Sequence, residues 1–426
     1  MSLPSRIENV VIGAGQAGLA MSHLLSRAGR DHVVLERRPT LGGGWQDRWD
    51  DFCLVTPNWS ASFGGDPYRG SDPDGFMTRD EIVARVASHA ATIRAPVVLD
   101  TEAVRIAPRA TGGFTVDTSG GGTVADRVVV AAGSFHSPRI PQISAALPAR
   151  LMQIHSHHYR REEALPPGGV LVVGTGQSGV QIAEELAEAG RRVYVSVGTA
   201  GRVPRRYRGK DIFHWLGGLA REGPRYGVEL PTVDKLPDPR LRLAGNPHLS
   251  GHSGGHDTNL REFAARGMTL LGRIENAHGE RLDLADDLAA NLARADRFFD
   301  ERFRQQIDTF IERSAPDTVA DDRQPFDFDP PVPDHLDLAS EDISSVIWTS
   351  GYRLDYSWID APIVDEMGIP RQKRGVSEVP GLYFLGLIWQ HNQVSATLFG
   401  PHQDGPYVAT QMGVPVTEDE TPPVVS

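Results

Sequence analysis

A glycine-rich turn near the start of the chain has the residue types and spacing needed to bind a pyrophosphate. The segment "VVIGAGQAGLAMSHLL", residues 10–25, matches GxGxxG through Gly13, Gly15 and Gly18. The first glycine allows a tight turn, the second lets the backbone approach a pyrophosphate, and the third lets helix and strand pack closely. The first N–H groups of the following helix then face the phosphates. We therefore expect a dinucleotide at this first glycine turn.

An acidic residue at the end of the next strand supports this expectation. The helix is expected to stop near Gly29, and the strand "HVVLE" ends at Glu36, 23 residues after Gly13. A carboxylate at about this distance is typical of the residue that binds the ribose hydroxyls. Because the same carboxylate would repel a ribose 2′-phosphate, the first turn suits FAD or NAD better than NADP.

A second glycine turn lies in "LVVGTGQSGVQIAEEL", residues 171–186, through Gly174, Gly176 and Gly179. It again follows an apolar strand and opens a helix, but the next strand, "RVYVSV", does not end in an acid. The stretch "GTAGRVPRRYRGKD" follows instead, with four arginines: Arg202, Arg205, Arg206 and Arg208. Guanidinium groups match phosphate geometry bidentately, so this loop indicates a 2′-phosphate and hence NADP. A solvated basic loop is the alternative.

Two dinucleotide turns in one chain imply a hydride relay, in which NADPH reduces a flavin. The flavin can then react with oxygen, a quinone, a metal or a disulfide. Cys53 is the only cysteine, so an internal disulfide or a CxxC pair is excluded.

Composition limits the remaining classes. A length of 426 residues indicates two or three domains, and a net charge of −12 argues against nucleic acid as a partner. No apolar run approaches the roughly 18 to 20 residues that span a bilayer. The first strand is expected to begin by about Asn9, which leaves no room for a targeting peptide, so we expect a cytoplasmic protein. The oligomeric state stays open, with a homodimer among the alternatives.

Four further segments resemble landmarks of the class B flavoprotein monooxygenases. They are "LGGGWQDRW" with Gly42, Gly43 and Trp45; "RVVVAAGSFHSPRIP" with Ala132, Gly133, Pro138 and Pro141; "IWTSGYR" with Thr349, Ser350 and Gly351; and "GLYFLGLIW" around Gly386. Together with the two glycine turns they cover most of the chain in the order of that family. The chain is most similar to flavin-containing and YUCCA-type monooxygenases and to small bacterial members, including relatives often labelled as a flavoprotein of cation transport.

The resemblance implies an enzyme with FAD and NADPH as cofactors, and O2 and a small molecule as substrates. It would form a C4a-(hydro)peroxyflavin and transfer one oxygen atom to a nucleophilic nitrogen or sulfur. Other readings stay open: a decarboxylating 2-oxo-acid monooxygenase, a Baeyer–Villiger-type oxygenase, an NADPH oxidase or quinone reductase, and a non-enzymatic redox-sensing flavoprotein.

One family motif is altered here. The fingerprint FxGxxxHxxx(W/Y/F) corresponds to "ARLMQIHSHHY", where His155 and Tyr159 are present and Ala149 and Leu151 replace the first two positions. The tryptophan of true Baeyer–Villiger enzymes is absent, which disfavours ketone oxidation. His155 is either functional or packed at the junction of two domains.

The resemblance and the glycine turns together give the candidate site residues. For FAD they are Gly13, Gly15, Gln16, Ala17, Gly18, Glu36, Arg37, Gly43, Trp45, Val104, Ala132, Gly133 and Gly386. For NADP they are Gly174, Gly176, Gln177, Ser178, Gly179, Arg202, Arg205 and Arg206. Asn58 is the candidate catalytic residue, because the family places a polar side chain there beside the flavin; a turn residue after Pro57 is the alternative.

These sites need an α/β fold with two Rossmann-like, doubly wound domains. We expect the FAD domain at 1–165 and 336–426, with the NADP domain inserted at 166–335. Within the insert, 223–257 reads as loop, and apolar residues from Leu288 to Phe310 recur with helical period. A Pro- and Asp-rich crossing leads back to the first domain, and the tail after about Val414 is expected to be disordered.

Three other features predict structure rather than chemistry. His248, His252 and His256 are spaced as metal ligands on a helix, but Pro247, Gly251, Gly254 and Gly255 break that helix, so we expect no metal. Thr78 is expected to cap a helix, and Cys53 to be a packed thiol.

Overall fold

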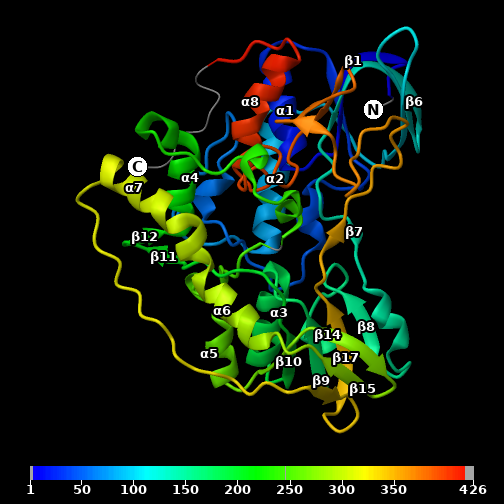
Figure 1. Ribbon diagram of the computed structural model, residues 1–426. Helices are drawn as coiled ribbons and strands as arrows, with labels where there is room; N and C mark the ends of the chain where they lie inside the picture. The colour runs from blue at the N-terminus through cyan, green and yellow to red at the C-terminus, as the bar shows by residue number, and fades with distance from the viewer. Residues whose placement is uncertain (1–2, 245, 418–426) are drawn as a thin grey trace.

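The computed structural model describes residues 3–244 and 246–417, which form two α/β units, each built on its own sheet (Figure 1). The parallel strands of the first, nine-stranded sheet follow the order β21-β6-β1-β2-β3. They are β1 (Arg6–Ile12), β2 (His32–Leu35), β3 (Val97–Val98), β6 (Gly121–Val130) and β21 (Leu382–Phe384). The antiparallel strands β4 (Ala103–Pro108), β5 (Phe114–Thr118), β19 (Gln372–Lys373) and β20 (Val376–Ser377) complete this sheet.

The two faces of the first sheet are covered differently. Val11 and Val129 pack against α1 (Gln16–Arg27) and α8 (Gly400–Gln411), which lie side by side. On the other face, Val10 and Val128 pack against Val116 of β5 and its neighbours. The prediction of a parallel α/β sheet is confirmed, but a β-hairpin takes the place of helices on one face. A buried parallel strand needs cover on both faces, and either element can supply it.

The second sheet has the order β13-β10-β9-β17-β8 and is parallel throughout. Its strands are β8 (Met152–His155), β9 (Gly169–Val173), β10 (Val193–Ser196), β13 (Thr269–Leu271) and β17 (Ile343–Trp348). Helices α3 (Gln177–Glu188), α5 (Leu260–Ala265) and α6 (Leu288–Phe299) lie on one face. The three-stranded sheet of β14 (Ile274–His278), β15 (Arg281–Leu284) and β16 (His335–Asp337) covers the other.

This arrangement corrects the predicted domain boundaries at 165/166 and 335/336. Strand β8 precedes the first boundary and β17 follows the second, yet both pair within the second sheet. Segments that resemble interdomain linkers adjoin both strands in the sequence. A short apolar run does not indicate which sheet its strand joins. The second unit therefore extends from about β8 to β17.

The two crossings between the units run beside each other. Strand β7 (Ser137–Pro138) pairs antiparallel with β18 (Tyr352–Arg353), and Arg139 N–H donates to Gly351 C=O at 3.0 Å. Both linkers expected from the sequence are thus joined in one short ribbon.

A helical region follows the second glycine turn in the chain. It contains β11 (Arg206–Tyr207), β12 (Lys210–Asp211), α4 (Ile212–Glu222), α6, the π-helical turn η9 (Asp300–Arg304) and α7 (Gln305–Ser314). The predicted apolar stripe is buried along its whole length, from Leu288 to Phe310, which confirms the helical period. The described residues of the segment 223–257, which leave out 245, form short 3-10 turns and isolated β-bridges; the turns are η5 (Gly223–Tyr226), η6 (Val233–Lys235), η7 (Pro239–Leu243) and η8 (His252–Gly254).

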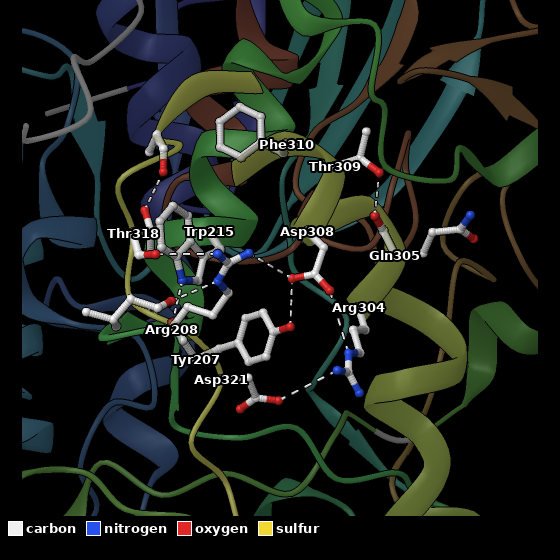
Figure 2. A network of polar contacts seen from close by, with 12 residues as sticks. Tyr207, Arg208, Trp215, Arg304, Gln305, Asp308, Thr309, Phe310, Thr318 and Asp321 are labelled. Carbon is white, nitrogen blue, oxygen red and sulfur yellow. Dashed lines mark hydrogen bonds and ion pairs between the residues drawn. The ribbon is translucent and has the colours of Figure 1, made fainter. Parts of the chain in front are cut away.

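The Pro- and Asp-rich crossing has no regular element between α7 and β16 and runs along the outside of the molecule (Figure 1). Figure 2 shows how it is attached. Tyr207 Oη donates to Asp308 of α7 at 2.7 Å, and Arg208 Nε donates to the Val319 carbonyl of the crossing at 2.9 Å. Arg304 lies 4.0 Å from Asp321. Polar contacts therefore hold this segment where apolar residues are few.

The remaining elements are one helix and several 3-10 turns in the loops of both units. Thr78 caps α2 (Arg79–Thr92) through a reciprocal capping box with Glu81, as predicted. The 3-10 turns are η1 (Gly43–Asp47), η2 (Asn58–Ala61), η3 (Gln142–Ala146) and η4 (Glu162–Ala164). The tail expected to be disordered lies outside the described residues from 418 onward. Within the described residues, none of the helices is both long and apolar enough to cross a membrane.

Candidate cofactor sites

A cavity of about 530 Å³ opens at the carboxyl ends of β1, β2 and β6, where ligands bind in folds of this kind. It brings together twelve of the thirteen residues predicted for FAD. These are Gly13, Gly15, Gln16, Ala17, Glu36, Arg37, Gly43, Trp45, Val104, Ala132, Gly133 and Gly386. Gly18 is buried and has a packing role. We call this the FAD cavity, after the cofactor that the sequence predicts for it.

The first glycine turn has the close contacts that its spacing implies. A Cβ on Gly18 would lie 1.8 Å from the Gly13 carbonyl oxygen, so this position admits only glycine. A Cβ on Gly43 would lie 2.8 Å from the Gly15 Cα, because the two loops face each other across the turn. On Gly15 itself a Cβ would meet only Gly43 Cα, at 3.8 Å. Gly15 therefore has free space beside it, as a pyrophosphate requires.

Glu36 is buried at the cavity wall and has its carboxylate fixed by the backbone. Its two oxygens accept the N–H groups of Ala14 at 2.9 Å and Arg38 at 3.1 Å. Each oxygen keeps a further lone pair for a ribose hydroxyl. The Arg38 guanidinium is held away by Asp47, at 2.9 and 2.6 Å. The turn, the acid and the cavity together fit a dinucleotide without a 2′-phosphate.

One side chain joins three segments that surround the cavity. Gln16, at the start of α1, accepts the Trp45 indole N–H at 2.9 Å and donates to the Thr397 carbonyl at 3.1 Å. Sequence reasoning missed other lining residues: Arg48, Thr101, Ser134, Phe135, His136, Trp358 and Ala396. They belong to loops without a spacing pattern, so only the folded chain brings them to the cavity.

The second glycine turn packs on β17 in a comparable way. Thr349 Oγ1 lies 2.8 Å from the carbonyl oxygens of both Val173 and Gly174. A Cβ on Gly179 would lie 2.1 Å from the Gly174 carbonyl oxygen, whereas a Cβ on Gly176 would meet nothing within 4 Å. As in the first turn, the middle glycine has free space beside it. Gln177 and Ser178 form the first turn of α3, so its free N–H groups can face a second pyrophosphate.

The predicted arginines separate into two kinds. Arg202 follows β10 and pairs with Asp296 at 3.1 Å, and its buried Nε has no hydrogen-bond partner among the described residues. Arg206 is exposed, and the described part of the chain gives it no ion pair. Both keep donors for a 2′-phosphate.

The role predicted for Arg205 is wrong. Its side chain is 2% exposed, pairs with Asp211 at 2.8 Å and donates to the Val55 carbonyl at 2.8 Å. The rings of Phe76 and Phe213 lie 4.7 and 5.6 Å from its guanidinium carbon. Burial lowers the pKa of Arg205, and Asp211 balances its charge, while its buried Nε, like that of Arg202, has no hydrogen-bond partner among the described residues. Arg205 thus ties the helical region to the first unit.

The three histidines spaced by four do not converge. His248 is buried, and its backbone N–H donates to the Gly201 carbonyl at 2.7 Å. His256 Nε2 lies 2.6 Å from Glu184, and His252 lies 3.8 Å from Glu188. The described residues contain no group of three or more His, Cys, Asp or Glu that could hold a metal ion.

Asn58 opens η2 and is 7% exposed, but it is not among the residues that line the FAD cavity. Its amide donates to the Asp72 carbonyl at 2.9 Å. Its Oδ1 is buried and has no hydrogen-bond partner within residues 3–244 and 246–417. The amide nitrogen is therefore committed to the fold, and only the oxygen is left for a ligand.

The altered fingerprint lies at the boundary between the units. His155 is fully buried, with Nε2 2.9 Å from the Gly351 carbonyl, and burial lowers its pKa to about 4. Tyr159 donates to Glu185 of α3 at 2.7 Å, and the Trp49 indole lies beside the same carboxylate. Burial raises the pKa of Glu185 to about 7. These residues join the first and second units rather than line the FAD cavity.

Comparisons with known proteins agree with this architecture. Residues 10–212 match the family of pyridine nucleotide-disulphide oxidoreductases. A CzcO-like oxidoreductase of Geobacillus kaustophilus is 31% identical over 406 residues, covering 94% of this chain and 97% of the relative. The chain belongs to the CzcO-like oxidoreductases.

More distant similarities point the same way. The rice indole-3-pyruvate monooxygenase YUCCA1 is 29% identical over 208 residues, which is 48% of this chain and 51% of the rice protein. A solved flavin monooxygenase of Stenotrophomonas maltophilia superposes with a TM-score of 0.64 at 19% identity, covering 96% and 98% of the two chains. The resemblance predicted from the sequence is confirmed: the protein is a flavin-dependent oxidoreductase, and membership of this family implies FAD and NADP as cofactors.

Proposed function

We propose that the protein is an NADPH-dependent flavin monooxygenase that transfers one oxygen atom from O2 to a small substrate at a nucleophilic nitrogen or sulfur. The observation that carries the proposal is the pair of glycine turns with opposite charge patterns. Glu36 ends the second strand of the first, and Arg202 follows the equivalent strand of the second. One turn therefore suits FAD and the other NADP.

The residues of this chain bind and orient the two nucleotides. The first glycine turn and α1 hold the FAD pyrophosphate, and Glu36 holds the adenosine ribose. The second glycine turn and α3 hold the NADP pyrophosphate, with Arg202 and Arg206 at its 2′-phosphate. The bound flavin supplies the hydride and oxygen chemistry, and the protein supplies orientation and exclusion of water. No proton-transferring triad is needed in such a site.

Asn58 is kept in this proposal as a residue that supports the oxygenation half of the reaction, through its unpaired Oδ1. An Asn58→Ala variant should bind FAD and accept hydride from NADPH as the native protein does. It should release more hydrogen peroxide per NADPH oxidised, because Oδ1 can accept a hydrogen bond from an N–H or O–H group during oxygenation, and losing such a bond costs about 1 kcal/mol. Unchanged peroxide release would leave Asn58 as a turn residue after Pro57.

Anaerobic reduction by NADPH followed by rapid mixing with oxygen tests the proposal as a whole. A monooxygenase should consume NADPH in step with an oxygenated amine or sulfide product. Stoichiometric peroxide with every substrate offered would make the protein an oxidase. Negligible flavin reduction by NADPH would exclude both activities.

A further inference from the structure

Helix α8 carries a buried carboxylate that neither nucleotide site uses. Asp404 is 2% exposed, and its nearest cation, Arg374, holds Nε 3.7 Å from Oδ1. Its Oδ2 has no hydrogen-bond partner among residues 3–244 and 246–417. Burial raises the pKa of Asp404 to about 6. Burying a carboxylate with so few compensating hydrogen bonds and charges lowers the free energy of unfolding. A functional role would explain why Asp404 is present.

The partner of Asp404 is a buried hydroxyl in a nearby loop. Ser395 is 1% exposed, and its Oγ accepts the backbone N–H groups of His391 at 3.1 Å and Asn392 at 3.2 Å. Since both lone pairs are occupied, the hydroxyl hydrogen is left for a third group, and the Asp404 carboxylate lies beside it. In this position Asp404 can orient the Ser395 hydroxyl so that its oxygen faces the two N–H groups.

The residues after Ser395 form a wall of the FAD cavity. Ala396 lines the cavity, and the Thr397 carbonyl accepts the Gln16 amide at 3.1 Å. Gln16 also accepts the indole N–H of Trp45, another residue that lines the cavity. The loop 391–397 thus connects Ser395, beside Asp404, to the cavity wall at Ala396 and, through Thr397 and Gln16, to Trp45.

We propose that Asp404 is a positioning residue of the flavin site, which holds the loop 391–397 against the FAD cavity by way of Ser395. The inference rests on the proposed assignment of this cavity to FAD. Asp404 touches neither the cavity nor the reacting atoms. Its contribution is to the shape of the wall at Ala396 and Thr397, and hence to how tightly and in what orientation the flavin is held.

The test is titration of the apoprotein with FAD, followed by quenching of flavin fluorescence and by the visible absorption band. Asp404→Ala and Ser395→Ala should each weaken FAD binding by about tenfold or more, since each removes a hydrogen bond to a charged group. Asp404→Asn keeps an acceptor oxygen for Ser395 and should restore affinity to within about threefold of the native protein. Thr410→Ala, an exposed hydroxyl on the same helix, is the matched control and should bind as the native protein does.

Affinity unchanged in Asp404→Ala, or equally poor binding by Asp404→Asn and Asp404→Ala, would overturn the inference. If circular dichroism shows Asp404→Ala to be unfolded, Ser395→Ala decides, because it removes only a hydroxyl. A native protein that fails to bind FAD would instead overturn the proposed function. Shifts of the visible band in Ser395→Ala relative to Thr410→Ala would support a wall role, which a general loss of stability would not produce.

Discussion

Replacing Gly15 with alanine should separate FAD binding from folding. Gly15 has φ −78° and ψ −175°, which alanine adopts without strain, and its Cβ would meet only Gly43 Cα at an ordinary 3.8 Å. Alanine is a poorer N-cap than glycine, which lowers the stability of the fold by up to about 1 kcal/mol. Alanine also reduces the conformational entropy of the unfolded chain, which offsets about 0.4 to 1 kcal/mol of this loss. The melting temperature of the apoprotein should therefore change little.

A bound pyrophosphate alters this balance, because the new methyl group occupies the space that it needs. Losing one charge-assisted hydrogen bond to a backbone N–H costs about 1.5 to 3 kcal/mol, so FAD should bind about ten- to a hundredfold more weakly. Fluorescence titration with FAD and thermal unfolding of the apoprotein measure the two effects separately.

Two matched variants make this prediction specific. Gly18→Ala should lose folded protein, since its Cβ would lie 1.8 Å from the Gly13 carbonyl oxygen. Gly176→Ala repeats the change at the second turn, where a Cβ meets nothing within 4 Å, and should weaken NADPH binding alone. Full FAD affinity in Gly15→Ala, or a melting temperature as low as that of Gly18→Ala, would refute the reasoning.

Three further expectations concern charged residues. Arg205→Ala leaves Asp211 buried without its partner, so the free energy of unfolding in urea should fall by about 3 to 5 kcal/mol. Arg206→Ala should change it little, and similar urea midpoints for the two variants would contradict a stabilising ion pair between Arg205 and Asp211. Arg202→Ala should raise the KM for NADPH about ten- to a hundredfold and that for NADH much less, in steady-state assays, and equal effects would remove Arg202 from the 2′-phosphate site. The pKa of Glu185 is raised to about 7, so its contribution to stability is full below its unfolded value near 4.5 and is lost as pH rises through 7. Relative to Glu185→Gln, the native protein should therefore lose stability between about pH 4.5 and 7 in unfolding titrations, and parallel pH profiles would count against this shift.

The backbone of the first site could be predicted from sequence because its requirements are local. Gly13, Gly15 and Gly18 are specified by one turn, and Glu36 by the length of one strand–helix–strand unit. The structure places Gly13, Gly15 and Glu36 at one cavity and Gly18 beneath it. The helical stripe was also predictable, because a period of 3.6 residues is visible without knowledge of what it packs against.

Long-range pairing decided the features that the sequence did not reveal. Arg205 stands beside Arg206 in the chain, yet its guanidinium meets Asp211, Val55 and Phe76, which no spacing pattern connects to it. Strands β8 and β17 were assigned to the wrong domain for the same reason: a short apolar run does not specify its neighbours in a sheet.

The boundary between the units bears directly on the flavin site. Besides the β7–β18 ribbon, two buried side chains make contacts across it: Arg205 donates to the carbonyl of Val55, and Glu185 lies beside the indole of Trp49. Both contacts end in the loop that runs from the cavity residue Trp45 to Asn58. Because each anchor is buried, its loss leaves an unpaired polar group that the loop must move to solvate. The second unit therefore helps to set the shape of the FAD cavity as well as to present the second nucleotide to it.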